Sequence, residues 1–261
     1  MVDFLSNQHG SAPIVTAAQQ LDVLLRHMGL SKEDIAMPER VLVPITPYDV
    51  RVVKRLLALG SPERLPLSGA SLHLAIVDGR EFAVVGPAVG APAAASLLEN
   101  LAVLGAKCVI AFGWCGSLQS DLKIGSLLIP RRAIREEGTS FHYLPAEIVP
   151  EAGARPAAAL FAACQESDVP VKEGTIWTTD ALYREARAKV MAFQESGVLA
   201  VEMETSAIFA VSSHLGIESA ILLIVSDELA GEDWRPGFLE DSFREAHEQA
   251  CRIAIAACSN L

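Results

Sequence analysis

The chain has 261 residues, with 21 basic against 32 acidic side chains and a formal net charge of −11. This balance argues against a general nucleic-acid binder or a protein that docks on an anionic membrane, since both need a surplus of lysine and arginine. A small anionic substrate needs only a local cluster of donors and is not excluded. The length suits one large domain with a sizeable core, and we expect a single domain over residues 1–261.

The five cysteines are odd in number and include no Cys-x-x-Cys pair, so reduced thiols in a cytoplasmic protein are the simplest interpretation. Residues Met1–Val15 lack a basic segment followed by an apolar one, and no secretory signal is expected there. No apolar run approaches the ~20 residues that a membrane-spanning helix requires.

The first half of the chain predicts alternating strands and helices. Two strands, Leu72–Val77 and Phe82–Val85, flank Asp78-Gly79, which is a hairpin signal. The other elements, in chain order, are a strand at Val41–Pro44, a helix at Tyr48–Leu59, a helix at Ala91–Leu104, a strand at Lys107–Phe112 leading into a turn at Gly113–Gly116, and a strand at Ser126–Ile129 ended by Pro130.

The second half continues the alternation. Its predicted elements are helices at Pro156–Cys164, Ala181–Gln194, Thr205–His214 and Ser242–Cys258, and strands at Val171–Trp177, Val198–Val201 and Ser219–Val225. This order indicates an α/β fold with helices on both faces of a sheet, and the early hairpin favours a mixed sheet. Ligands gather beyond the carboxyl ends of strands in such sheets, which directs attention to three strand ends.

The first strand end is the predicted turn that contains Gly113, Trp114, Cys115 and Gly116. Glycine lets backbone N–H groups approach an anion or a sugar. The segment is neither a dinucleotide fingerprint nor a P-loop, and a redox dithiol would need a second cysteine where Leu118 stands. The alternative is a tight turn with a packed tryptophan and a buried small cysteine.

The second strand end places Glu202, Met203 and Glu204 where a buried strand meets a helix. Acidic residues at a helix N-terminus can serve only as caps. They also suit a sugar, because a carboxylate accepts two hydrogen bonds from a cis-diol while methionine packs on the ring.

The third strand end is Ser226-Asp227, after a run of apolar residues. An acid that is partly shielded from water there is a candidate proton donor, and an N-cap is the structural alternative. The six histidines are scattered and His-Glu-x-x-His is missing, so we expect neither a metal nor a cofactor.

Together these residues resemble the nucleoside phosphorylase family, which includes uridine phosphorylases, bacterial-type purine nucleoside phosphorylases and methylthioadenosine nucleosidases. The similarity spans roughly residues 41–227. The stretches that carry it are Gly113–Leu118, Ile124–Pro130 leading to Glu137–Ser140, Val201–Ala207, and Val225–Asp227. The resemblance implies a three-layer fold with a central mixed sheet flanked by helices, and cleavage of a nucleoside N-glycosidic bond.

The resemblance also implies roles for individual residues. Glu204 would bind the ribose hydroxyls, Met203 would line the sugar, and Asp227 would protonate or hydrogen-bond the departing base. The remaining candidates for the substrate-binding wall are Glu202, Ser226, Gly113, Trp114, Cys115, Gly116, Thr178 and Tyr183, the last as a residue that stacks on the base.

Three donor positions of the family's phosphate-binding pattern are missing here. Relatives carry an early Gly-Asp-Pro-x-Arg, whereas the comparable stretch here, Ile45–Asp49, lacks the glycine and puts Asp49 where the arginine belongs. An arginine and a hydroxyl residue of the family are replaced by Ala111 and Trp114. Four arginines are candidates for rebuilding an anion site: Arg51, Arg55, Arg132 and Arg135.

We therefore predict a nucleoside phosphorylase that releases free base and ribose 1-phosphate and assembles as a homo-oligomer, from dimer to hexamer. A nucleosidase that uses water is the close alternative, because the lost donors disfavour phosphate. A non-catalytic nucleoside-binding protein and a thiol enzyme that uses Cys115 are further alternatives. The predicted partners are a small nucleoside and inorganic phosphate, without nucleic acid or membrane.

Overall fold

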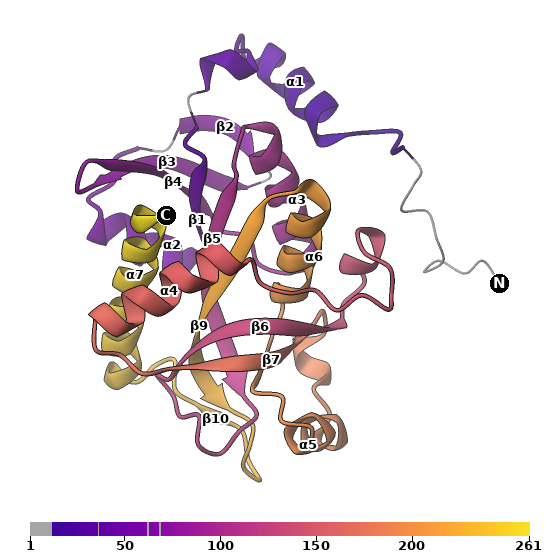
Figure 1. Cartoon of the computed structure of the whole chain (residues 1–261), viewed down its shortest axis with the longest axis vertical. Coiled ribbons are helices and arrows are strands. Elements are labelled where there is room, and N and C mark those ends of the chain that lie inside the picture. The colour runs from indigo at the N-terminus through magenta and orange to yellow at the C-terminus, as the bar shows by residue number, and fades with distance from the viewer. Residues whose placement is uncertain (1–11, 36, 62, 68) are drawn as a thin grey trace, which may run out of the picture.

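The computed structural model describes residues 12–35, 37–61, 63–67 and 69–261 (Figure 1). Most of Met1–Val15, where no secretory signal was expected, lies outside these residues. The helices are α1 (Ala17–His27), α2 (Pro47–Leu56), α3 (Ala91–Val103), α4 (Ala154–Glu166), α5 (Arg187–Glu195), α6 (Thr205–Leu215) and α7 (Asp241–Asn260), with 3-10 helices at Lys32–Asp34, Ser140–His142 and Leu182–Arg184. The strands are β1 (Arg40–Pro44), β2 (Glu63–Leu67), β3 (Ala70–Val77), β4 (Arg80–Gly86), β5 (Cys108–Ser117), β6 (Leu127–Glu136), β7 (Val171–Thr179), β8 (Ala200–Glu202), β9 (Glu218–Glu228) and β10 (Arg235–Pro236).

The strands form one mixed sheet in the order β10-β9-β6-β7-β8-β5-β1-β4-β3-β2. An additional parallel pairing of β5 with β9 closes the strands β9, β6, β7, β8 and β5 into a ring. β5 is the hub of this sheet, since it pairs with β1 in its first half, with β8 at Gly116 and Ser117, and with β9 along its length. β5 and β9 are parallel, so their carboxyl ends lie at one edge, and the short strand β8, antiparallel to β5, pairs with that end of β5.

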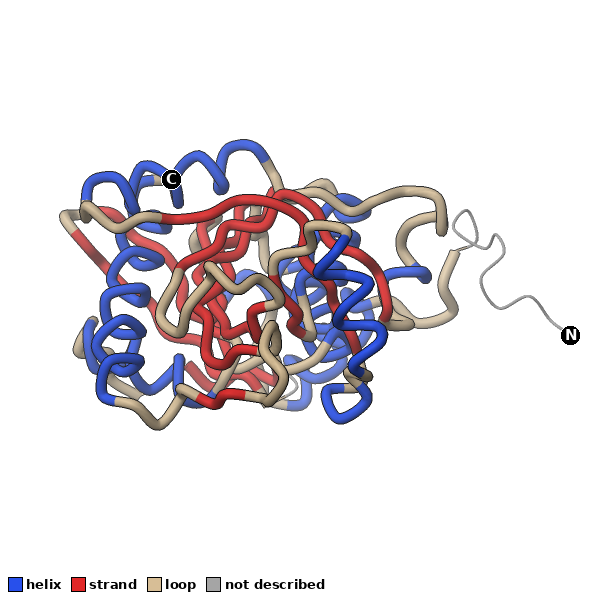
Figure 2. The backbone as a smooth tube through the Cα atoms, turned by 90° about the horizontal axis from the view of Figure 1, so that it is seen from below, coloured by secondary structure: helices blue, strands red, loops and turns tan. Residues whose placement is uncertain are grey.

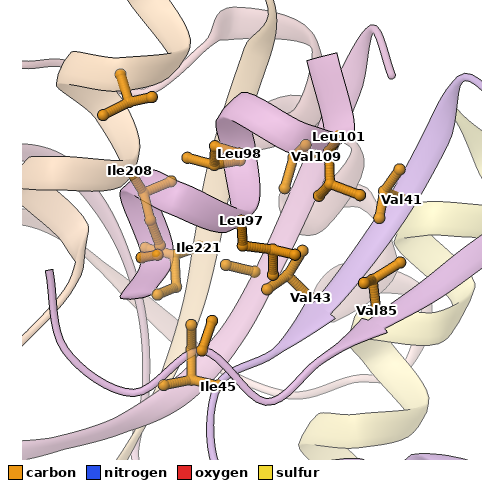
Figure 3. Packing of buried hydrophobic residues seen from close by; sticks show 14 of the residues in the cluster. Val41, Val43, Ile45, Val85, Leu97, Leu98, Leu101, Val109, Ile208 and Ile221 are labelled. Atoms are coloured by element: carbon orange, nitrogen blue, oxygen red, sulfur yellow. The ribbon is translucent and has the colours of Figure 1, made fainter. Parts of the chain in front are cut away.

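Helices cover both sides of the strands, as the sequence predicted (Figure 2). On one side α4 and α7 pack on β5 and β9, and α2 packs on α7 and β1. On the other side α3 packs on α1 and α6. Figure 3 shows Leu97 and Leu101 of α3 near Val41, Val43 and Val109 of the sheet, while Leu98 points toward the side of Ile208. Each fully buried side chain of this kind contributes about 1.5–3 kcal/mol, which holds α3 in place.

Turn chemistry accounts for the element boundaries that the sequence predicted well. Asp78 and Gly79 have φ angles of 51° and 74°, the left-handed conformations that a tight two-residue hairpin requires. Gly216 has a φ angle of 68° just after α6, as a glycine that ends a helix does.

Several predicted boundaries are wrong. Gly113–Gly116 is not a turn. Pairing with β8 and β9 continues β5 to Ser117, with a register shift in the β9 pairing between Cys115 and Gly116. Pro130 does not end β6, since a register shift between Pro130 and Arg132 accommodates the missing N–H group. Ser226 and Asp227 accordingly lie within β9 rather than beyond it.

The predicted helix over Ala181–Gln194 is also wrong in its first part. The chain makes a 3-10 turn over Leu182–Arg184, and α5 begins only at Arg187. The amphipathic helix α1, which the sequence did not predict, begins with a capping box between Thr16 and Gln19. Among the described residues, no helix combines the length and the apolar character needed to cross a membrane.

Candidate active site

A cavity of about 650 Å³ opens at the edge where β5, β8 and β9 end. This volume lies within the range of small-molecule sites in proteins. It brings together most of the predicted site residues: Trp114, Cys115, Gly116, Tyr183, Glu202, Met203, Glu204, Ser226 and Asp227. Further lining residues that the sequence did not single out are Val89, Leu182, Glu185, Val201, Leu229, Trp234 and Phe238, besides Ile45 and Thr46.

Glu204 lies at the junction between β8 and α6, with only 5% of its surface exposed. Its Oε1 accepts a hydrogen bond of 2.5 Å from the backbone N–H of Gly90, whose φ angle of 88° turns this amide toward the carboxylate. Burial, and then the charge of Glu202, raise the pKa of Glu204 to about 8. Met203 lines the cavity beside it. The pair thus offers a carboxyl group and an apolar thioether to the same ligand.

Glu202 faces the cavity, but its oxygens already have partners. Oε1 accepts from the Thr178 hydroxyl at 2.5 Å, and Oε2 accepts from the amides of Glu204 and Thr205 at 2.8 Å each. Burial raises the pKa of Glu202. Thr178 does not line the cavity, because its hydroxyl also accepts from the amide of Ser206 behind Glu202. These two residues brace the start of α6.

Asp227 reaches the cavity from β9. Its Oδ1 accepts from the Ser226 hydroxyl at 2.6 Å, and its Oδ2 accepts from the Trp234 indole N–H at 2.8 Å. A Cβ atom on Gly116 would lie 2.3 Å from Leu229 Cδ1 and 3.2 Å from Asp227 Oδ2. Glycine at position 116 therefore leaves the space that Asp227 occupies.

Glu185 is a cavity residue that sequence reasoning missed. It follows the 3-10 helix Leu182–Arg184, and its side chain is half-buried. Burial, and then the charge of Asp227, raise the pKa of Glu185 to about 7. Exposed side chains of Tyr183 and Trp234 flank this end of the cavity, which gives it an aromatic rim.

Asp49 does not face the cavity, although Trp114 beside it does. The Asp49 side chain is fully buried and accepts hydrogen bonds from Trp114 Nε1 at 2.8 Å and from His247 Nε2 at 2.7 Å. Its Oδ2 also accepts from the amide of Thr46 at 2.8 Å, which caps α2. Asp49, which stands at the family's arginine position, therefore fixes the position of Trp114 in the cavity lining.

None of the four candidate arginines lies in the cavity. Arg51 stacks over Tyr48, Arg55 pairs with Glu248, and Arg132 pairs with Glu151. Arg135 donates to Ser140 and to the backbone carbonyls of residues 144, 145 and 148. Of all the residues that the structure describes, no lysine, arginine or histidine lines this cavity.

The structure gives Gly113 and Cys115 smaller roles in the site than the sequence predicted. Gly113 packs against Ile45 and does not line the cavity. Cys115 lines it, but burial and the charges of Asp227 and Glu202 raise the pKa of its thiol well above the usual value. A thiol held in its neutral form is a poor nucleophile. Within the described ranges, no three His, Cys, Asp or Glu side chains gather to hold a metal ion.

Comparison with known proteins places this site in a family. The sequence profile of the Phosphorylase superfamily matches residues 39–259. The chain belongs to the phosphorylase superfamily. It is 28% identical over 227 residues to guanosine phosphorylase from Halorubrum lacusprofundi, covering 84% of this chain and 93% of the relative. It is also 28% identical over 231 residues to a DeoD-type purine nucleoside phosphorylase from Caldanaerobacter subterraneus, covering 87% and 99%.

Solved structures of the phosphorylase superfamily share the fold. Uridine phosphorylase from Vibrio fischeri superposes with a TM-score of 0.77 at 21% identity, covering 86% of this chain and 93% of that one. Purine nucleoside phosphorylase from Toxoplasma gondii in complex with immucillin-H gives 0.77 at 23% identity, covering 88% and 93%. The predicted family, the mixed α/β fold flanked by helices and the enzymatic nature of the chain are confirmed.

Proposed function

We propose that this phosphorylase-superfamily enzyme cleaves the N-glycosidic bond of a nucleoside and releases the free base. The observation that carries the proposal is the meeting of Glu204, Met203 and Asp227 in one cavity, from the β8–α6 junction and from β9. A carboxyl group and a thioether suit the two faces of a ribose, and an acidic side chain on the far strand suits a base.

The arrangement fits the charges that develop during such a cleavage. Departure of the base leaves positive charge on the sugar in an oxocarbenium-like state, while the base gains negative charge. Glu204 stands on the sugar side, where its ionised form stabilises the cation. Glu202 holds the junction behind it through the amides of Glu204 and Thr205. On the base side, Asp227 is held by Ser226 and Trp234, so that its position is set before the base arrives.

Water is the acceptor that the cavity lining supports best. Its ionisable side chains other than the cysteine and the tyrosine are the carboxyl groups of Glu185, Glu202, Glu204 and Asp227, and no cation lines it among the described residues. A phosphate dianion placed there would meet carboxyl groups and no compensating donor cation. Trp114, anchored on Asp49, stands where the family resemblance places a phosphate-binding hydroxyl.

Phosphorolysis is the second candidate, favoured by the names of the relatives, which are guanosine and purine nucleoside phosphorylases. Those names, with the aromatic rim of Tyr183, Trp234 and Phe238, also favour a purine base. The cytoplasmic location, the single domain and the homo-oligomer remain predictions from the sequence.

The test is base release from inosine, guanosine, adenosine, methylthioadenosine and uridine, with and without phosphate. We expect a purine nucleoside to be cleaved, at a rate that phosphate does not raise. A strict phosphate requirement would establish the phosphorylase alternative. Release of no base under either condition would reject the enzyme proposal and favour the nucleoside-binding protein.

A variant assigns the cleavage to this site. Asp227→Asn should slow base release by ~100–10,000-fold, the usual range for a lost acid–base group. Asp233→Asn is the matched control, since Asp233 is exposed on the loop that follows β9. Near-wild-type turnover of Asp227→Asn would remove Asp227 from the proposed mechanism.

A further inference from the structure

The loop of residues 229–234, between β9 and β10, forms part of the cavity wall. Its first and last residues, Leu229 and Trp234, both line the cavity. The two ends of the loop are held together, because β10 pairs antiparallel with the last residues of β9. A change in the conformation of this loop would therefore move Trp234 relative to the rest of the cavity.

Trp234 connects this loop to Asp227. The Trp234 indole N–H donates to Asp227 Oδ2 at 2.8 Å, and the Ser226 hydroxyl donates to Oδ1 at 2.6 Å. Each carboxyl oxygen has two lone-pair positions, so one hydrogen bond on each oxygen orients the group and leaves the other positions open to a ligand or a proton. Ser226 is the neighbour of Asp227 on β9, whereas Trp234 belongs to the loop. The orientation of Asp227 thus depends on where the loop holds Trp234.

Arg187, the first residue of α5, holds the middle of the loop. Its guanidinium donates to the backbone carbonyls of Leu229, Gly231 and Glu232, and α5 lies at the same end of the molecule as the loop (Figure 1). A guanidinium carries five N–H donors in a fixed plane, which lets it bind several carbonyls at once. Among the residues that the structure describes, no other side chain donates a hydrogen bond to a carbonyl of this loop.

The contacts of Arg187 differ from those of an ordinary surface arginine. An exposed arginine that pairs with one carboxylate contributes little to a structure. Within the described ranges Arg187 forms no such ion pair, and its donors go to three carbonyls of one loop. Arg187 also follows the segment that contributes Leu182, Tyr183 and Glu185 to the cavity lining. One side chain therefore joins two segments of the cavity wall.

We propose that Arg187 is a positioning residue for nucleoside cleavage: it holds the loop so that Trp234 keeps the Asp227 carboxyl group in its orientation. This inference rests on the proposed function and adds to it a residue that does not itself line the cavity. Displacement of a reacting group by about 1 Å can cost ~100-fold in rate. Loss of Arg187 loosens the support of Asp227 without removing the acid, so we expect a smaller effect.

The test is a double-mutant cycle on the purine nucleoside that the wild type cleaves best. Trp234→Phe keeps a ring but loses the N–H group, and we expect it to lower kcat by ~10–100-fold. Arg187→Ala should lower kcat by about 10-fold and change KM little. Because both changes act on the same contact, the double variant should be no slower than Trp234→Phe alone. The control Arg184→Ala removes the same charge from an exposed side chain on the preceding 3-10 helix and should keep wild-type turnover.

A second measurement reports on the loop without any substrate. The loop contains Glu232, after which the endoproteinase Glu-C can cut, and mass spectrometry identifies the site of cleavage. Proteolysis of a folded protein tracks how often the segment opens. Arg187→Ala should therefore be cut after Glu232 faster than the wild type, whereas Arg184→Ala should be cut at the wild-type rate.

The outcomes separate this inference from the proposed function. A wild type that cleaves no nucleoside overturns the proposed function and the positioning role with it, and digestion then decides only whether Arg187 holds the loop. If the wild type is active, an unchanged kcat of Arg187→Ala overturns the positioning role. Losses that multiply in the double variant overturn the path through Trp234. Equal cleavage after Glu232 in all variants would show that Arg187 does not hold the loop.

Discussion

Removing the Asp49 carboxylate behind Trp114 should destabilise the protein more than a change to alanine at any acidic residue that lines the cavity. Asp49 is fully buried and connects three elements through hydrogen bonds from the Thr46 amide, the Trp114 indole and the His247 imidazole. Asp49→Ala leaves the N–H groups of Trp114 and His247 without this acceptor in a buried site. Each unsatisfied group costs about 1–3 kcal/mol, and the lost helix cap adds about 0.5–2 kcal/mol.

The expected loss is therefore about 2.5–8 kcal/mol in the free energy of unfolding, a large share of the ~5–15 kcal/mol of a typical protein. Urea denaturation followed by far-UV circular dichroism measures it. Asp49→Asn keeps the size and one acceptor oxygen, and it should lose less. Asp22→Ala, whose exposed side chain pairs with Arg26 on α1, is the control that should leave stability unchanged. A loss below about 1 kcal/mol for Asp49→Ala would refute the account of Asp49 as a buried anchor.

Three further predictions concern the cavity itself. The pKa of Glu204 is raised to about 8 in the folded protein, so folding stability falls as pH rises from the ordinary pKa of 4.5 through about 8. Glu204→Gln should therefore be more stable than wild type above pH 8, while losing activity. Urea denaturation at two pH values measures this, and a variant that is less stable than wild type at alkaline pH would contradict it. Gly116→Ala should displace Asp227 and lower kcat by about 100-fold with the fold retained. The control Gly138→Ala, whose Cβ meets no atom within 4 Å, should keep wild-type turnover. Steady-state kinetics test this, and unchanged turnover of Gly116→Ala would show that the site accommodates the added methyl group. Cys115→Ala should keep turnover close to wild type, because the thiol is held neutral, and loss of turnover in a folded variant would revive the thiol-enzyme alternative.

The sequence predicted the elements whose signals are local. The hairpin at Asp78-Gly79 and the helix over residues 91–103 depend on turn residues and on a regular apolar stripe, and both occur as expected. The stretch from Gly113 to Ser117 was misjudged because its glycines suggest a turn, whereas tertiary pairing with β8 and β9 keeps it extended. Pairing with strands that are distant in the sequence cannot be predicted from the residues of the segment itself.

In the site, too, the residues with local sequence signals were predicted and those placed by tertiary structure were not. Glu204 and Asp227 could be found because Glu204 follows the buried strand β8, Asp227 lies near the end of β9, and both belong to motifs that resemble a known family. Glu185 could not, because the helical period over Ala181–Gln194 placed it on an ordinary polar helix and only the 3-10 turn turns it into the cavity. The role of Asp49 was likewise hidden, since its partner His247 lies 198 residues away in the sequence.

The lining of the cavity bears on the choice of acceptor. Its acidic side chains are Glu185, Glu202, Glu204 and Asp227, no cation lines it among the described residues, and Trp114 stands where the resemblance places a phosphate-binding hydroxyl. We therefore expect this cavity to stabilise an incoming phosphate anion poorly.

The most direct test of this account is base release from a purine nucleoside by the purified protein in a phosphate-free buffer, followed by addition of phosphate. We predict release of base and free ribose before phosphate is added and no acceleration afterwards. Release that begins only with phosphate, and yields ribose 1-phosphate, would contradict the assignment of water as the acceptor.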